Sequence, residues 1–161
     1  SIEEVAKALQ VPLSLFDLSK PVMLEKTNQY LYFAVPDLKS LKEFSPDMRQ
    51  TTEFAKKDEL VVICALTGET FESSNHLHAR GFAPLVGVPE DPFTGSMQGG
   101  LAAYAMTQGI LDPQLKWIGS EQGHFIGRPG STKLEIVSQF PYQVRLHAEA
   151  VHVFEAELCL P

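Results

Sequence analysis

The chain contains a long stretch without charged side chains, from Pro92 to Leu111. A helix that is apolar on all sides is usually buried on all sides. The stretch also has small side chains that let neighbouring backbone come close: Gly99, Gly100, Ala102, Ala103 and Ala105. The pattern predicts a central helix over residues 97–110, with a sheet wrapped around it. Free N–H groups and the helix dipole would direct its N-terminus at a site for an anion.

Most other apolar positions follow the periodicity of strands. The run from Glu59 to Leu66 is typical of a strand covered on both faces. Residues 76–83 alternate between polar and apolar side chains and predict a strand that leads to the uncharged stretch. Residues 22–26 and 29–35 flank a Thr27-Asn28 turn and predict a hairpin. The closing part of the chain predicts a meander of strands over 115–121, 133–139, 143–147 and 150–158.

The helical patterns outside the central stretch are short. Ser1-Ile2-Glu3-Glu4 resembles a capping box and predicts a helix that ends near Gln10. Two more helices are predicted over 37–44 and 46–57. Strands and helices do not alternate regularly, and no Gly-x-Gly-x-x-Gly or P-loop pattern occurs, so a doubly wound nucleotide-binding sheet is not expected. We predict one α+β domain over residues 1–161, with a mixed or antiparallel sheet curled around one buried helix.

Composition narrows the classes of partner. The 161 residues are 44% hydrophobic, which provides enough apolar surface for a sizeable core, and the formal net charge is −7. Nucleic acid and anionic membranes need clustered Lys and Arg, so neither is expected as a partner. No signal peptide or long apolar span is present, which favours a cytoplasmic protein. Cys64 and Cys159 lie in apolar runs and are expected to be buried free thiols.

Polar side chains gather where the central helix is predicted to begin. Asp91 follows Glu90 and precedes Thr94 and Ser96. A carboxylate near a helix N-terminus stays ionised and can orient or accept a proton. Gly95 lets a ligand approach the backbone N–H groups, and Ser96 adds a hydroxyl. Two interpretations stay open, because Asp91 and Thr94 are also ordinary helix-capping residues.

Two further constellations carry candidate chemistry. Arg128 lies between a glycine and a proline, where its guanidinium could hold a carboxylate or form an ion pair with Glu121. His76 and His78 would share one strand face and could bind zinc, but a third ligand is needed. The other histidines, His124, His147 and His152, are scattered, so no metal is expected. The loop over 91–96 contains no cysteine, which removes a thiol nucleophile there.

These residues resemble a known family. Glu90-Asp91-Pro92-Phe93-Thr94-Gly95-Ser96, preceded by Arg80-Gly81-Phe82-Ala83-Pro84, looks like the second-half signature of the PhzF-like phenazine-biosynthesis isomerases. Glu121-Gln122-Gly123 followed by Gly127-Arg128-Pro129 resembles the next block of that family. The resemblance covers most of the chain, from about Lys20 onward. It implies a fold similar to diaminopimelate epimerase, in which two matching domains each curl a mixed sheet into a barrel around a central helix.

The resemblance also implies a mechanism. Family members are cofactor-independent isomerases that move a proton along a small carboxylate-bearing substrate in the cleft between the domains. On the matching positions, Asp91 and Ser96 would be catalytic. Thr94, Gly95, Ser96 and Arg128 would bind substrate, and pre-aimed donors would stabilise the negative charge that builds up. No cofactor is expected.

The chain also departs from the family pattern. The principal acid/base glutamate and a Gly-His motif of the family belong to its first domain, and neither has a match here. The chain begins at Ser1 and looks like the second domain alone, completed by an N-terminal domain or by another copy. Three hypotheses follow: half of an isomerase site, a non-catalytic domain that binds small carboxylates, or a domain that only associates with a partner.

Overall fold

One mixed sheet dominates the protein. The computed structural model describes residues 1–159, and its sheet has the order β1-β2-β3-β4-β6-β7-β8, with β5 paired to β4 alone. The β2/β3 and β4/β6 pairs are parallel and the other pairs are antiparallel. The strands are β1 (Met23–Glu25), β2 (Tyr30–Ala34), β3 (Val62–Thr67), β4 (Leu77–Ala83), β5 (Val88–Asp91), β6 (Trp117–Gln122), β7 (Gly130–Gln139) and β8 (Tyr142–His147).

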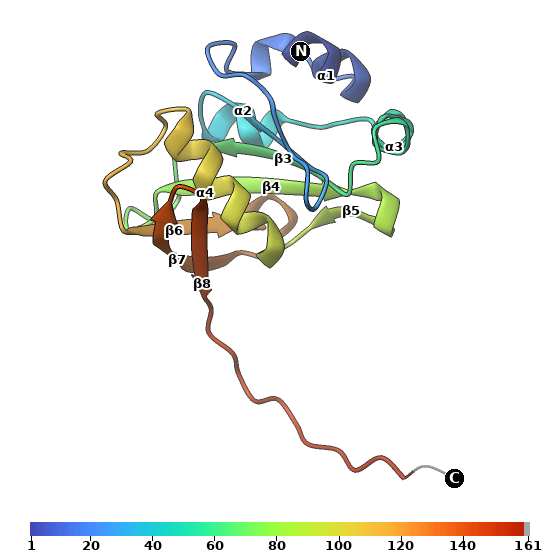
Figure 1. Cartoon of the computed structure of the whole chain (residues 1–161). Coiled ribbons are helices and arrows are strands. Elements are labelled where there is room, and N and C mark those ends of the chain that lie inside the picture. Colours follow the sequence, from blue (N-terminus) through green and yellow to red (C-terminus); the bar gives the residue numbers. More distant parts are fainter. Residues whose placement is uncertain (160–161) are drawn as a thin grey trace.

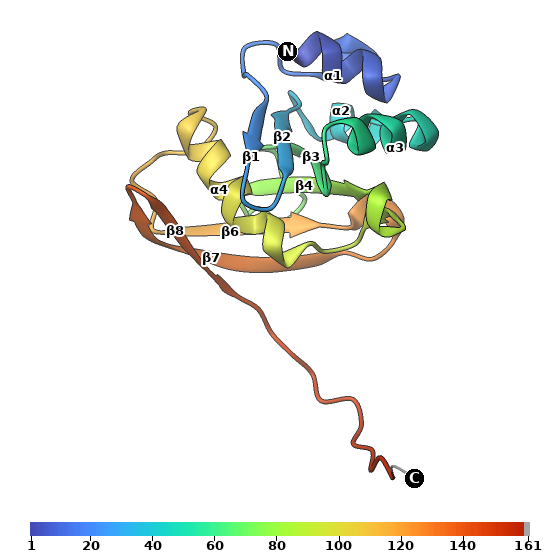
Figure 2. The same ribbon diagram turned by 45° about the vertical axis from the view of Figure 1, so that its right-hand side comes forward.

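The sheet curls around helix α4 (Gln98–Thr107), which lies against β2, β7 and β8 (Figure 1). Helices α1 (Ile2–Leu9), α2 (Leu38–Glu43) and α3 (Met48–Lys57) lie on the other side of the sheet (Figure 2). Within residues 1–159, four short 3-10 turns complete the fold: η1 (Leu13–Leu15), η2 (Pro84–Val86), η3 (Gly95–Met97) and η4 (His124–Ile126). The predicted α+β class, with a curled sheet around one buried helix, is confirmed. The outer strands β1 and β8 do not pair within residues 1–159, so the barrel stays open.

The central strands separate two apolar cores. Along β2, Tyr30 and Tyr32 belong to the core around α4, whereas Leu31 and Phe33 belong to the core under α1, α2 and α3. This division follows from the strand period of two, since successive side chains point to opposite faces. Strand β3 is buried at every position and divides in the same way, as predicted for a strand covered on both faces.

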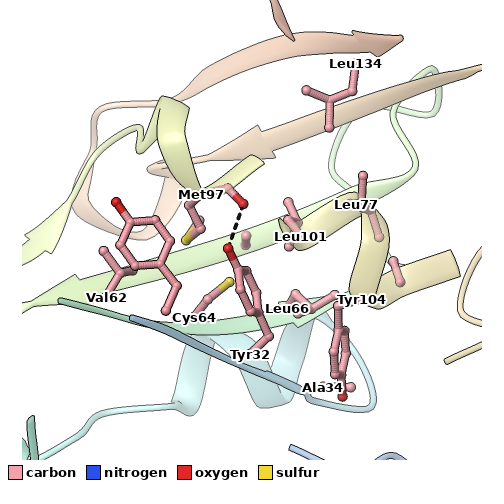
Figure 3. Close-up of a cluster of buried hydrophobic side chains, with 14 of the residues drawn as sticks. Tyr32, Ala34, Val62, Cys64, Leu66, Leu77, Met97, Leu101, Tyr104 and Leu134 are labelled. Atoms are coloured by element: carbon pink, nitrogen blue, oxygen red, sulfur yellow. Dashed lines mark hydrogen bonds between the residues drawn. The ribbon is translucent and has the colours of Figure 1, made fainter. Parts of the chain in front are cut away.

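Helix α4 is fixed to the sheet through tyrosines (Figure 3). The buried Tyr32 hydroxyl donates to the Met97 carbonyl at 3.0 Å, and burial raises the pKa of Tyr32 above its usual range. A side chain at Gly100 would collide with the Tyr32 ring, with its Cβ 2.6 Å from the ring carbon that carries the hydroxyl. Near the other end of the helix, the Tyr104 hydroxyl donates to the Pro21 carbonyl at 2.9 Å. The small residues of this stretch therefore permit the close approach that the sequence predicted.

The local structure differs from the sequence-based expectation in two places. Strand β5 forms over residues for which no strand was predicted, because Asp91 and Val88 pair with Gly81 and Ala83 of β4. The strand predicted over 150–158 does not form, and residues 148–159 are exposed without helix or strand. An alternating pattern makes a strand only where a neighbouring strand pairs with it. Cys159 is consequently exposed, whereas Cys64 is the buried free thiol that was expected.

Residues 160 and 161, the end of the expected domain, lie outside the described residues. Among the helices that are described, none is long and apolar enough to cross a membrane.

Candidate functional site

The site forms where β4 changes its neighbour along one edge. Residues 77–79 of β4 pair in parallel with residues 120–122 of β6. A few residues further, Gly81 pairs in antiparallel fashion with Asp91 of β5. The segments that follow β5 and β6 therefore start from adjacent points of the sheet. These segments contain the two motifs that resemble the PhzF-like family, over residues 90–96 and 121–129.

Gln122 joins the two motifs. Its side chain is fully buried, and its Nε2 donates to the Asp91 carbonyl at 2.7 Å. Its Oε1 accepts from the Thr94 backbone N–H at 3.1 Å and from Gln98 Nε2 at 3.3 Å. One amide thus satisfies the backbone of the 91–96 loop on both sides of Pro92. Buried backbone groups need such partners, and the loop takes its shape from them.

Gly123 brings the motifs into backbone contact. It has a φ of 84°, and a Cβ at this position would lie 2.6 Å from the Pro92 carbonyl oxygen. The Arg128 carbonyl oxygen would also collide with a Cβ at Gly123. The Arg128 N–H donates to the Gly123 carbonyl at 3.0 Å. Only glycine fits a position that combines the left-handed conformation with this close approach. The loop after β6 therefore buttresses the loop after β5.

Asp91 stabilises its own loop and does not cap a helix. Its Oδ2 accepts from the Thr94 hydroxyl at 2.8 Å, and its Oδ1 accepts from the Phe93 N–H at 3.4 Å. The carboxylate is half-buried. Helix α4 is preceded by η3, and neither start carries a side-chain capping bond. The capping interpretation of Asp91 and Thr94 is therefore wrong for the central helix.

Gly95 and Ser96 form the exposed end of the helical segment. Ser96 Oγ lies 2.8 Å from Tyr30 Oη, so the hydroxyl of Ser96 is already oriented. Within residues 1–159, the backbone N–H groups of Gly95 and Ser96 have no acceptor. Together with the carboxylate of Asp91, this surface offers free donors for an anion and one group that can hold a proton.

Two acidic residues of the motifs, Glu90 and Glu121, are bound to other partners and do not contribute to the Asp91–Ser96 surface. Arg80 donates to both carboxylate oxygens of Glu90, at 2.8 and 2.7 Å, so Glu90 is removed from the Asp91 surface. Glu121 is fully buried and lies beside His78, so its expected ion pair with Arg128 is absent. The Arg128 side chain is exposed, and its guanidinium forms no hydrogen bond or ion pair with any residue that the structure describes.

Two cavities lie near the motifs, but neither includes Asp91, Gly95 or Ser96 in its lining. One, of about 730 Å³, is bordered by Phe93 and by β7. The other, of about 660 Å³, lies between α2 and η4. Gly95 and Ser96 are exposed and Asp91 is half-buried, so solvent reaches the Asp91–Ser96 surface.

A histidine cluster was not anticipated. His78 Nδ1 lies 3.0 Å from Glu121 Oε1, and His124 lies beside them. Burial lowers the pKa of His78 to about 4, although the Glu121 carboxylate acts in the opposite direction. For Glu121, burial raises the pKa, but hydrogen bonds from Asn75 and from two backbone N–H groups outweigh it, so its pKa lies below the usual range. His76 does not join the cluster, because its Nδ1 accepts from the Gly119 N–H at 3.0 Å.

Comparison with known sequences identifies the family. The model of the phenazine biosynthesis-like (PhzC-PhzF) proteins matches residues 2–156, and the chain therefore belongs to this family. An uncharacterized isomerase of Clostridium acetobutylicum is 29% identical over 98% of this chain and 54% of the relative. An uncharacterized isomerase of Deinococcus radiodurans is 31% identical over 83% of this chain and 43% of the relative. The chain thus spans about half the length of these curated relatives.

Solved structures support the fold. A PhzF-family phenazine biosynthesis protein of Bacillus anthracis superposes with a TM-score of 0.74 at 22% identity, covering 91% of this chain and 50% of that one. A predicted epimerase of Pseudomonas aeruginosa gives a TM-score of 0.66 at 21% identity, covering 96% of this chain and 52% of that one. The open, curled sheet around α4 is therefore an architecture of PhzF-like and epimerase-like proteins.

Proposed function

We propose that the protein is a cofactor-independent isomerase and that this chain supplies one wall of its active site. The observation that carries the proposal is the family match over residues 2–156, in a chain whose two motifs meet at Gln122. The isomerase names of its curated relatives support the reaction class. The reaction would be a proton shift on a small carboxylate-bearing substrate.

The roles follow from the geometry at the start of η3. The free N–H groups of Gly95 and Ser96 would hold the substrate carboxylate, since donors at a helix N-terminus favour an anion. Asp91 would orient or relay the proton, with the Thr94 hydroxyl fixing one of its oxygens at 2.8 Å. Removing a proton beside a conjugated acid builds negative charge, which preorganised donors stabilise. Binding of substrate by the exposed Arg128 guanidinium stays a prediction.

The opposite wall would come from a second domain. We propose that this chain corresponds to the C-terminal half of a two-domain protein whose N-terminal half carries the acid/base glutamate. The coverage of about half of each relative and the open surface at Ser96 support this arrangement. Another copy of the chain is the second candidate for that wall. Nucleic acid and membranes are not among the proposed partners, and the cytoplasmic location stays a prediction.

The test is proton exchange. The chain would be fused behind the N-terminal half of the Clostridium acetobutylicum relative, and a panel of small amino acids and unsaturated cyclic carboxylic acids would be incubated with it in D₂O. We expect deuterium at one substrate carbon by NMR, and loss of this exchange in Asp91→Asn.

Gln143→Leu, on the exposed side of β8, is the matched control and should exchange like the unmodified fusion. Exchange that survives Asp91→Asn would remove Asp91 from the mechanism. Carboxylate binding without any exchange would favour the non-catalytic binding domain, and neither binding nor exchange would favour a domain that only associates.

A further inference from the structure

His78, Glu121 and His124 come together from three separate elements. His78 lies on β4, Glu121 on β6 and His124 on η4, and one ligand atom of each lies within 4.8 Å of the others. The side chains of His78 and Glu121 are fully buried, and His124 is half-buried. Such a combination of imidazole and carboxylate is the usual chemistry of a transition-metal centre.

The hydrogen bonds fix the protonation of His78. Its Nδ1 lies 3.0 Å from Glu121 Oε1, and an ionised carboxylate only accepts, so the proton sits on Nδ1. The lone pair of the neutral ring is then on Nε2. That nitrogen is buried and has no hydrogen-bond partner among the described residues, and the same is true of Nδ1 of His124. Buried polar atoms without partners are rare in folded proteins.

Glu121 has no free position for a metal. Its two oxygens accept from His78 and from Phe71 N–H, Glu72 N–H and Asn75 Nδ2, which are four donors. A carboxylate offers about four acceptor sites, so they are filled. A carboxylate that accepts from the far nitrogen of a metal-bound histidine fixes the tautomer and the orientation of the ring. Glu121 is placed to have this role toward His78.

We propose that His78 Nε2 and His124 Nδ1 bind a divalent transition-metal ion such as Zn²⁺, with Glu121 holding His78 from behind. Water molecules or a small anion would supply the third and fourth ligands, which the two histidines leave open. The cavity of about 660 Å³ beside His124 is also lined by Lys39 and Lys42, whose positive charges suit an anion. No metal was expected from the sequence, and this site is separate from the residues of the proposed isomerase function.

The two imidazoles are neighbours, with ring centroids 4.9 Å apart and an interplanar angle of 54°. Ligand atoms on a tetrahedral Zn²⁺ ion lie about 3.3 Å apart, given bonds of about 2.0 Å, so binding requires the two nitrogens to reach that separation. Phe71 covers the imidazoles, with its ring 4.7 Å from that of His124 and 5.3 Å from that of His78. Phe71 is 53% exposed, so solvent reaches the ring that covers the two imidazoles.

The experiment uses ZnCl₂ and CoCl₂ on the chelator-treated protein. We expect one Zn²⁺ per chain by equilibrium dialysis, and visible absorption bands when Co²⁺ binds. His124→Phe keeps the aromatic stack on Phe71 but removes the nitrogen. It should weaken Zn²⁺ affinity by at least the ~10–100-fold that loss of an outer-shell partner costs.

His147→Ala is the matched control, because His147 and Glu135 form the exposed histidine–carboxylate pair of β8 and β7. It should leave Zn²⁺ affinity unchanged. Circular dichroism would establish that each variant is folded. The proposal is overturned if the unmodified protein binds no Zn²⁺ at millimolar concentration, if His124→Phe binds equally well, or if His147→Ala abolishes binding.

Discussion

The clearest energetic prediction concerns Gln122→Leu. Leucine is close in size to glutamine, so the change removes the amide without a large cavity. It deprives the Asp91 carbonyl of a donor at 2.7 Å and the Thr94 N–H of an acceptor at 3.1 Å. The 3.3 Å contacts of the amide with Gln98 and with the Thr94 hydroxyl are lost as well.

The expected cost follows from the groups that lose their partners. A buried donor or acceptor without a partner costs about 1–3 kcal/mol. Two strong bonds are lost, and the Asp91 carbonyl can recover part of its share from water because Asp91 is only half-buried. We therefore expect the free energy of unfolding to fall by about 2–4 kcal/mol. The longer contacts add little, since hydrogen bonds weaken with distance.

The assay is equilibrium unfolding in urea. Gln143→Leu makes the same chemical change at an exposed position of β8 and should stay within about 0.5 kcal/mol of the unmodified protein. Amide hydrogen exchange should also show faster exchange at Thr94 in Gln122→Leu. A loss below about 1 kcal/mol, or one equal to that of Gln143→Leu, would refute the view that Gln122 joins the two motifs.

Two further substitutions test the surroundings of the site by urea unfolding. Gly123→Ala should cost at least about 2 kcal/mol, because strain at φ 84° adds to the collision with Pro92. Gly127→Ala, at φ 70° with open space around the Cβ, should cost only about 1 kcal/mol, and equal losses would disprove the close-approach argument. Arg80→Met should cost about 3–5 kcal/mol, because it leaves the partly buried Glu90 unpaired and deprives two carbonyls of their donor. Glu90→Gln keeps an acceptor for Arg80, so a cost as large as that of Arg80→Met would contradict this account.

The local pattern of apolar residues was sufficient to predict the helix and the strand that are buried on all sides. The uncharged stretch that became α4 and the continuous apolar run that became β3 were predicted because each is covered on every side. Strand β5 was missed because Pro89 and two acidic residues make it look like a loop. Over 150–158 the error was the opposite, because a strand was predicted where none forms. Alternation of polar and apolar residues shows only that a segment can form a strand. Whether it does depends on a neighbouring strand that pairs with it.

The site was predictable in part for a similar reason. The residues near Asp91 lie close together in sequence, so their proximity could be expected. The hydrogen-bond partners of Glu121 could not be predicted, because Asn75 and His78 lie more than 40 positions away along the chain. The nearby Arg128 looked like its natural partner. In the structure, the left-handed turns at Gly123 and Gly127 fold the intervening loop, and the Arg128 side chain is left in solvent.

The unclosed barrel has a consequence for self-association. Strands β1 and β8 end the sheet, so each presents one row of backbone N–H and C=O groups that has no partner strand within residues 1–159. Such edges are templates on which a second molecule can extend the sheet, and charged side chains oppose this. On β8, the exposed Arg145 pairs with Glu135 of β7 and keeps charge beside the edge. β1 is only three residues long. Short length protects one edge against aggregation, and charge protects the other.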